Sequence, residues 1–307
     1  MLDFLWTNKE WLFSGGGVTA ILAIIAALFK WLPQRFAHKP KTLLSSRDVA
    51  STVPIQSSSE FNSKNESEVT KIAKRFRRIL DLMNGGRSYA PYTIAGLAEI
   101  MSLNSVGELE SVFLGEKEPP FEFIKSFCET FGINKQWLLE GKESPFSDHD
   151  LLIYDPLDCL NLIQQFNPQK VLFIRSSSEV GEVFILLKMA DWKFKIFPEI
   201  WHISDHVGGG GRGQIFSLYR LILTLQKQYG SSLCGGRILP KEQFEALSSG
   251  ELFPGAAIPS HENPWWDDFV DVHHKYPVSS SYEANYGKGF IEAQAIVRQK
   301  LQEEIVP

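Results

Sequence analysis

Residues 11–31, WLFSGGGVTAILAIIAALFKW, are the stretch that most restricts how this chain can fold. No charged side chain occurs between Trp11 and Phe29. A helix of this length, rising about 1.5 Å per residue, spans the hydrocarbon core of a bilayer, which is about 30 Å thick. Trp11 and Trp31 stand at its two ends, where amphipathic rings favour the headgroup level. The stretch therefore predicts a transmembrane helix over residues 11–31.

Three other structures fit this stretch less well. A signal peptide carries its basic residues before the apolar run, whereas here Lys30, Arg35, Lys39 and Lys41 come after it. A buried core helix is rarely uncharged for so long, and an interfacial helix has a charged face that this stretch lacks. The positive-inside rule places the residues after the helix in the cytoplasm and leaves residues 1–10 as a short non-cytoplasmic tail. We therefore expect a single-pass inner-membrane protein with the lipid bilayer as a partner.

A stripe of small residues follows one side of the expected helix, formed by Gly16, Ala20, Ala23 and Ala27. Such a stripe lets two membrane helices approach closely, which indicates self-association. Small residues are also common in membrane helices, and the sequence leaves both explanations open. The opening W-L-F-S-G is similar to the N-terminal anchors of many bacterial membrane-tethered accessory and phage-defence proteins. This resemblance implies a bacterial inner membrane.

Composition restricts the function of the remaining chain. The net charge of −5 argues against a protein that coats nucleic acid along its whole length. The three cysteines are far apart and lack the spacing of metal ligands. Residues 32–66 are rich in serine and have no sustained apolar period, which is typical of a flexible linker.

A basic amphipathic helix is expected from Ser67 to Asn84. Apolar residues recur there every three or four positions, and the opposite face carries Lys71, Lys74, Arg75, Arg77 and Arg78. This basic face is either a solvated helix surface or a contact for anionic lipid or nucleic acid. Three further helices are expected between residues 92 and 146, separated by a turn near Asn104 and by Pro119-Pro120.

The order of these features resembles the Cro-type, XRE-like phage-repressor helix-turn-helix family over residues 67–146. The matching positions are Leu97-Ala98-Glu99, Asn104-Ser105, Gly115 followed by Pro119, Phe131-Gly132-Ile133-Asn134, and Trp137-Leu138-Leu139 with Gly141. The resemblance implies an all-α helix-turn-helix domain over residues 67–147. It also implies that Val106–Leu114 is the helix that enters the major groove of DNA, with Ser105, Glu108, Glu110 and Ser111 at recognition positions.

The charge of this region departs from the family's pattern. Residues 92–146 contain nine glutamates and four lysines, with no aspartate or arginine, which leaves a net charge of −5. A DNA-binding surface must neutralise several phosphates and therefore needs a positive charge. The sequence thus favours protein docking or self-association over DNA binding.

The region from Leu151 to Pro307 is expected to form an α+β domain with an antiparallel sheet. Residues 170–175, 181–189 and 192–197 are short runs rich in Val, Ile and Phe, as strands are. Residues 201–207 form a fourth strand or a short helix. A strongly apolar helix follows from Gln214, and two more helices are expected near residues 240–250 and 289–304.

Two features of this domain are candidates for chemistry. The glycine-rich turn Gly209, Gly210, Gly211, Arg212 and Gly213 precedes a helix and is either a loop for a phosphate or another ligand or a plain flexible loop. His202 and His206 would share one face of a helix, as in some metal sites, but they would lie too far apart on a strand. We expect no metal, no cofactor and no catalytic residue, although the sequence leaves an enzyme open.

Together these features predict a membrane-tethered bacterial regulator or adaptor. Its cytoplasmic helix-turn-helix would dock a protein or bind DNA in transcription regulation, and its C-terminal domain would sense a ligand. The alternative is an antiviral, phage-defence effector that acts through oligomerisation of the membrane helix.

Overall fold

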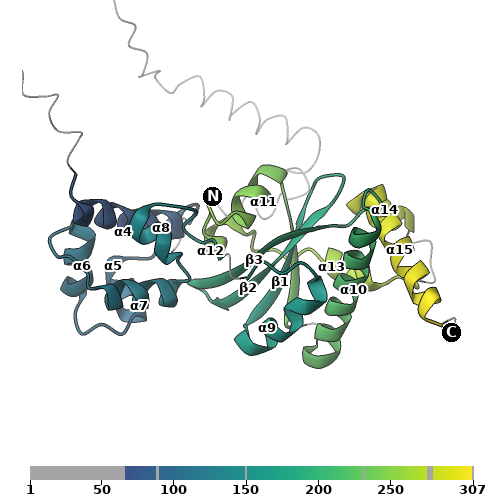
Figure 1. Cartoon of the computed structure of the whole chain (residues 1–307), viewed down its shortest axis with the longest axis horizontal. Coiled ribbons are helices and arrows are strands. Elements are labelled where there is room, and N and C mark those ends of the chain that lie inside the picture. The colour runs from purple at the N-terminus through teal and green to yellow at the C-terminus, as the bar shows by residue number, and fades with distance from the viewer. Residues whose placement is uncertain (1–65, 88–89, 149–150, 231, 275–278, 306–307) are drawn as a thin grey trace, which may run out of the picture. The chain divides into compact units, whose positions relative to one another are not determined.

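The computed structural model describes residues 66–305 apart from the short segments 88–89, 149–150, 231 and 275–278. The described residues all fall within one compact unit of the chain. They form helices on both faces of a four-stranded sheet (Figure 1).

The first five described helices form one cluster, which we call the five-helix unit. It comprises α4 (Glu68–Asn84), α5 (Ile94–Ile100), α6 (Val106–Leu114), α7 (Phe121–Phe131) and α8 (Lys135–Glu140). The Ser67 hydroxyl caps α4 by accepting a hydrogen bond from the Thr70 amide at 3.2 Å. The rings of Phe76, Phe113 and Phe127 pack together in its core, with centroids 4.6–6.5 Å apart.

The sheet is mixed, and the prediction of an antiparallel sheet is wrong. Its strands are β1 (Lys170–Ser176), β2 (Glu182–Ala190), β3 (Lys193–His202) and β4 (Cys234–Leu239), in the order β3-β2-β1-β4. The first three form an antiparallel meander, whereas β4 pairs in parallel with β1. The helix α10 (Gly209–Tyr229) connects β3 to β4, and such a crossover lets two strands run parallel.

Strand β4 is absent from the sequence expectation because Gly235 and Gly236 have the composition of a turn. The structure gives these glycines a packing role. A Cβ atom on Gly236 would lie 2.5 Å from the Asn263 carbonyl oxygen and from Trp266 Cδ1. Glycine inside a strand often marks such a close approach of other groups.

Each face of the sheet is buried under its own set of helices. Along β1, Val171 and Phe173 point to one core, while Leu172 and Ile174 point to the other. The first core is closed by α9 (Cys159–Phe166), α10, α13 (Trp265–Val270), α14 (Ser279–Tyr286) and α15 (Lys288–Ile305), together with the short 3-10 helix Pro156–Asp158. The second is closed by α11 (Lys241–Ser248), α12 (Pro254–Ala257) and the five-helix unit. Figure 1 shows α10 and α11 on opposite faces of the sheet.

The five-helix unit shares its core with the sheet. Phe127 and Phe131 belong to the same buried cluster as Phe184 and Leu186 of β2. At the end of α7, Gly132 has a φ of +68°, and a Cβ atom there would lie 2.7 Å from the Phe194 carbonyl oxygen of β3. The division into domains 67–147 and 151–307 stays a prediction.

The expectation of a single-pass membrane protein needs correction. No helix in the described part of the chain combines the length and the apolar character that crossing a bilayer requires. The longest described helix, α10, carries Arg212, Arg220 and Lys227. The expected transmembrane residues 11–31, with Gly16, Ala20, Ala23 and Ala27, and the linker 32–66 lie outside the described residues. On the helices that the structure describes, the inner-membrane localisation is contradicted, and the defence-effector alternative stays a prediction.

Candidate functional sites

Two of the five basic side chains of α4 form hydrogen bonds inside the five-helix unit. Arg75 Nη1 donates to the carbonyl oxygens of Leu138 and Leu139, at 3.2 and 2.7 Å, and so caps the end of α8. Arg77 donates in the same way to the Phe113 carbonyl oxygen in the last turn of α6.

The remaining basic residues of α4 differ from these arginines. Lys71 and Lys74 form surface ion pairs with Glu68 and Glu66, at 2.7 and 2.6 Å. Arg78 is exposed and makes no ion pair with any other described residue. Two of the five basic residues therefore hold the fold together, two form surface ion pairs, and Arg78 is left exposed.

The residues predicted for DNA recognition lie on α6 and at its start. Ser105 is the N-cap residue, and its side chain makes no capping hydrogen bond. The Ser111 hydroxyl donates to the Glu108 carbonyl oxygen at 3.1 Å, inside the helix. Glu110 is exposed, and Glu108 is partly exposed. The helix thus presents carboxylates where base-reading proteins present hydrogen-bond donors and positive charge.

A shallow cavity of about 360 Å³ lies between α6 and α7, and we call it the α6–α7 groove. Its lining combines three apolar residues with two acidic side chains and one basic side chain: Glu108, Val112, Lys117, Pro120, Glu122 and Phe123. Beside it, Phe121 is 72% exposed, and Leu114 at the end of α6 is 58% exposed. Aromatic side chains left so exposed are typical of a surface that contacts another protein.

The glycine-rich segment is a helix in the structure. Gly209, Gly210, Gly211, Arg212 and Gly213 form the first residues of α10, and Gly208 is the N-cap. The four cavities described in the structure are lined by other residues. The segment that the sequence analysis treated as a loop is therefore the first turn of α10.

The two histidines do not share a helix. His202 ends β3, whereas His206 lies beyond it, outside any helix or strand, and is exposed. Among the described residues, no group of three or more His, Cys, Asp and Glu side chains is arranged to hold a metal ion. The three cysteines are free and buried, and burial raises the pKa of each thiol to about 12.

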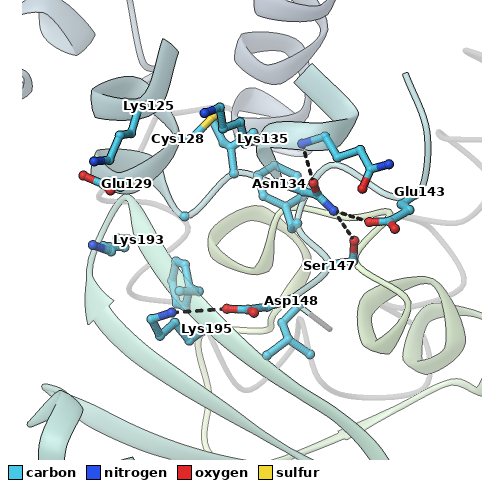
Figure 2. Close-up of a pocket in the computed structure, with 16 residues that line it drawn as sticks. Lys125, Cys128, Glu129, Asn134, Lys135, Glu143, Ser147, Asp148, Lys193 and Lys195 are labelled. Atoms are coloured by element: carbon cyan, nitrogen blue, oxygen red, sulfur yellow. Dashed lines mark hydrogen bonds and ion pairs between the residues drawn. The ribbon is translucent and has the colours of Figure 1, made fainter. Parts of the chain in front are cut away.

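A larger cavity, of about 580 Å³, lies where the five-helix unit meets the sheet, and we call it the junction pocket (Figure 2). Figure 2 shows Lys125 and Glu129 of α7 above Lys193 and Lys195 of β3. The start of α8 and the loop after it close the other side with Asn134, Lys135, Glu143, Ser147 and Asp148. Pockets of 300–1,000 Å³ at the boundary between two packed units are the usual places for small ligands.

The side of the pocket formed by α8 and the following loop is held by hydrogen bonds. Asn134 Nδ2 donates to a Glu143 carboxylate oxygen at 2.7 Å and to the Ser147 hydroxyl at 2.9 Å. Lys195 of β3 reaches across to this loop and pairs with Asp148 at 3.2 Å. These contacts fix the wall and occupy two of the three carboxylates that line the pocket.

The sequence analysis missed this pocket entirely. Its four lysines lie at positions 125, 135, 193 and 195; the first two belong to the consecutive helices α7 and α8, and the last two belong to β3, far along the chain. No local pattern unites them, because only the packing of α7 against β3 brings them together. The one local signal is the pair Lys193 and Lys195, which alternate along an otherwise apolar strand.

Comparison of the chain with protein families, with curated proteins and with solved structures found no match.

Proposed function

We propose that the five-helix unit is a repressor-type helix-turn-helix module that docks a protein, and that the chain is a regulator or adaptor acting through this contact. The partner is a segment with basic side chains around one large apolar anchor. The rest of the described chain, built on the sheet, supplies the sensing part.

The observation that carries the proposal is the composition of the α6–α7 groove. Glu108 and Glu122 supply negative charge beside apolar residues and outweigh Lys117 by one charge, and Phe121 is exposed next to the groove. Grooves between helices commonly receive the apolar face of an amphipathic helix. Complementary charge then favours a basic partner and repels DNA.

The distribution of positive charge supports protein docking in preference to DNA. Arg75 and Arg77 donate hydrogen bonds to carbonyl groups at helix ends within the unit, so they contribute less to a phosphate-binding surface. An interface for DNA instead needs several free cations near the groove-entering helix.

A random peptide library selected against the full chain tests the proposal. We expect enrichment of peptides with Lys or Arg flanking Leu, Phe or Trp. Phe121→Ala should weaken the binding of a selected peptide about tenfold, as loss of an aromatic anchor does. Leu152→Ala is the matched control, because Leu152 is also well exposed, at 60%, but lies outside the groove.

Two results would overturn protein docking. One is selection of acidic peptides, or of none at all. The other is tight, salt-dependent binding of duplex DNA that strengthens in Glu108→Ala, which would make α6 a DNA-reading helix.

A further inference from the structure

The junction pocket has an excess of positive charge on its rim. Within the described part of the chain, Lys125, Lys135 and Lys193 make no ion pair. Of the three carboxylates, Asp148 is paired with Lys195, and Glu143 accepts from Asn134. The four lysines and three carboxylates of the lining leave a surplus of one positive charge, and the three lysines without an ion pair carry it.

One of these lysines is only partly compensated by nearby negative charge. Lys193 is half-buried, and burial together with the adjacent Lys195 ammonium lowers its pKa, although the Glu129 carboxylate offsets part of this effect. A negatively charged ligand would offset both effects, because it supplies the opposite charge where water has been excluded.

The floor of the pocket is apolar. It contains the buried side chains of Ile133, Phe146 and Ile196 and the partly buried ring of Phe194. A bare inorganic ion would leave this surface uncovered. A ligand that carries a flat apolar body next to its charged group would cover the floor and reach the lysines at the same time.

We propose that the junction pocket binds a small phosphate-bearing ligand with a flat apolar body, of which a nucleoside monophosphate is the simplest example. Lys125, Lys135 and Lys193 contact the phosphate dianion, and the ring lies on the floor beside Phe194. The volume of about 580 Å³ is sufficient for such a molecule. The proposal does not depend on what the α6–α7 groove binds.

Calorimetric titration of the full chain with adenosine 5′-monophosphate tests the assignment. We expect a dissociation constant of about 10–100 µM. Inorganic phosphate should bind at least about tenfold more weakly, and adenosine, which lacks the charge, should give no measurable heat. These two ligands separate the contribution of the rim from that of the floor.

Paired variants locate the site. Lys125→Ala/Lys193→Ala should weaken binding of the nucleotide at least about tenfold, because it removes two charge-assisted contacts. Lys71→Ala/Lys74→Ala changes the net charge equally but lies on α4, so it should leave the affinity unchanged. The Lys193→Arg variant should keep most of the affinity that the Lys193→Ala variant loses. Peptide binding at the α6–α7 groove should be unaffected by all of them, so failure of either proposal is visible separately.

Several results would overturn the inference. They are absence of nucleotide binding at about 10 mM, equal binding of adenosine or inorganic phosphate, and an unchanged affinity in Lys125→Ala/Lys193→Ala.

Discussion

At Gly132 the five-helix unit and the sheet approach each other closely. This glycine ends α7 in the left-handed region, and its missing side chain leaves room for the Phe194 carbonyl oxygen. Both requirements are particular to glycine, because any Cβ would be strained by the φ of +68° and would also collide with β3.

Gly132→Ala is therefore expected to lower the free energy of unfolding by about 2 kcal/mol or more, as substitutions at a positive φ in a crowded position do. Urea denaturation followed by far-UV circular dichroism measures the change. Gly107→Ala is the control, since Gly107 lies inside α6 with nothing within 4 Å of the added Cβ, and it should raise the stability slightly. Equal stabilities of the two variants would contradict the role of Gly132.

The buried thiols make stability depend on alkaline pH. Burial raises the pKa of Cys128, Cys159 and Cys234 from 9.0 to about 12 in the folded chain, whereas the unfolded chain has the ordinary value. Above pH 9 the unfolded state releases protons that the folded state retains, so the free energy of unfolding falls as pH rises.

We expect a decrease of up to about 1.4 kcal/mol per pH unit for each thiol between pH 9 and 11. Urea denaturation at intervals of half a pH unit measures the slope, and Cys159→Ala should flatten it. The native thiols should also resist alkylation at pH 8. Rapid alkylation of folded protein would show that they are accessible.

The helices of the five-helix unit depend on side chains that satisfy their last carbonyl groups. Arg75 donates hydrogen bonds to the last carbonyl groups of α8, and Arg77 donates to one in the last turn of α6. Hydrogen bonds from a charged donor contribute about 1.5–3 kcal/mol each, which is large for a helix of only six residues such as α8.

Arg75→Ala is accordingly expected to lower the free energy of unfolding by about 2 kcal/mol. Arg78→Ala, on the same helix, should change it by less than about 0.5 kcal/mol, because Arg78 is exposed and pairs with no described residue. Thermal denaturation of both variants gives the comparison. Similar losses in the two would mean that the whole basic face acts through its charge.

The elements differ in how far the sequence predicted them. Helices with strong apolar periods, such as α4 and α7, lie where the sequence placed them, since the signal is local. Strand β4 was missed because its glycines, Gly235 and Gly236, are required by packing against residues distant in sequence. At Gly236 these residues are Trp266 and Asn263. The junction pocket was missed for the same reason, because its lysines meet only through the contact of α7 with β3. The residues of the α6–α7 groove, in contrast, form one continuous stretch whose acidity the sequence already showed.

For the molecule as a whole, the shared core predicts cooperative unfolding of the described chain. Phe127 and Phe131 of the five-helix unit are buried in the same cluster as Phe184 and Phe244. Separating the two parts would expose these rings to water, at about 25 cal/mol for each Å² of apolar surface.

We expect Phe184→Ala, on β2, to destabilise the five-helix unit and the sheet together, by about 3–5 kcal/mol. Hydrogen exchange followed by mass spectrometry distinguishes the regions. Protection should fall in α7 as well as in β1 and β2. Loss confined to the strands would show that residues 67–147 and 151–307 are independent domains, as the sequence predicted.

Strand β3 forms one edge of the sheet, and its composition has a consequence for behaviour at high concentration. Exposed edges invite sheets of neighbouring molecules to join, which begins aggregation. The end of α7 covers this edge at the Phe194 carbonyl oxygen, Lys193 and Lys195 place charge on either side of that contact, and Pro198 lacks the amide that a joining strand would need. Lys193, which we propose contacts an anion at the junction pocket, would thus also help Lys195 to keep copies of the chain apart, and replacing both lysines with valine would favour fibrous assembly.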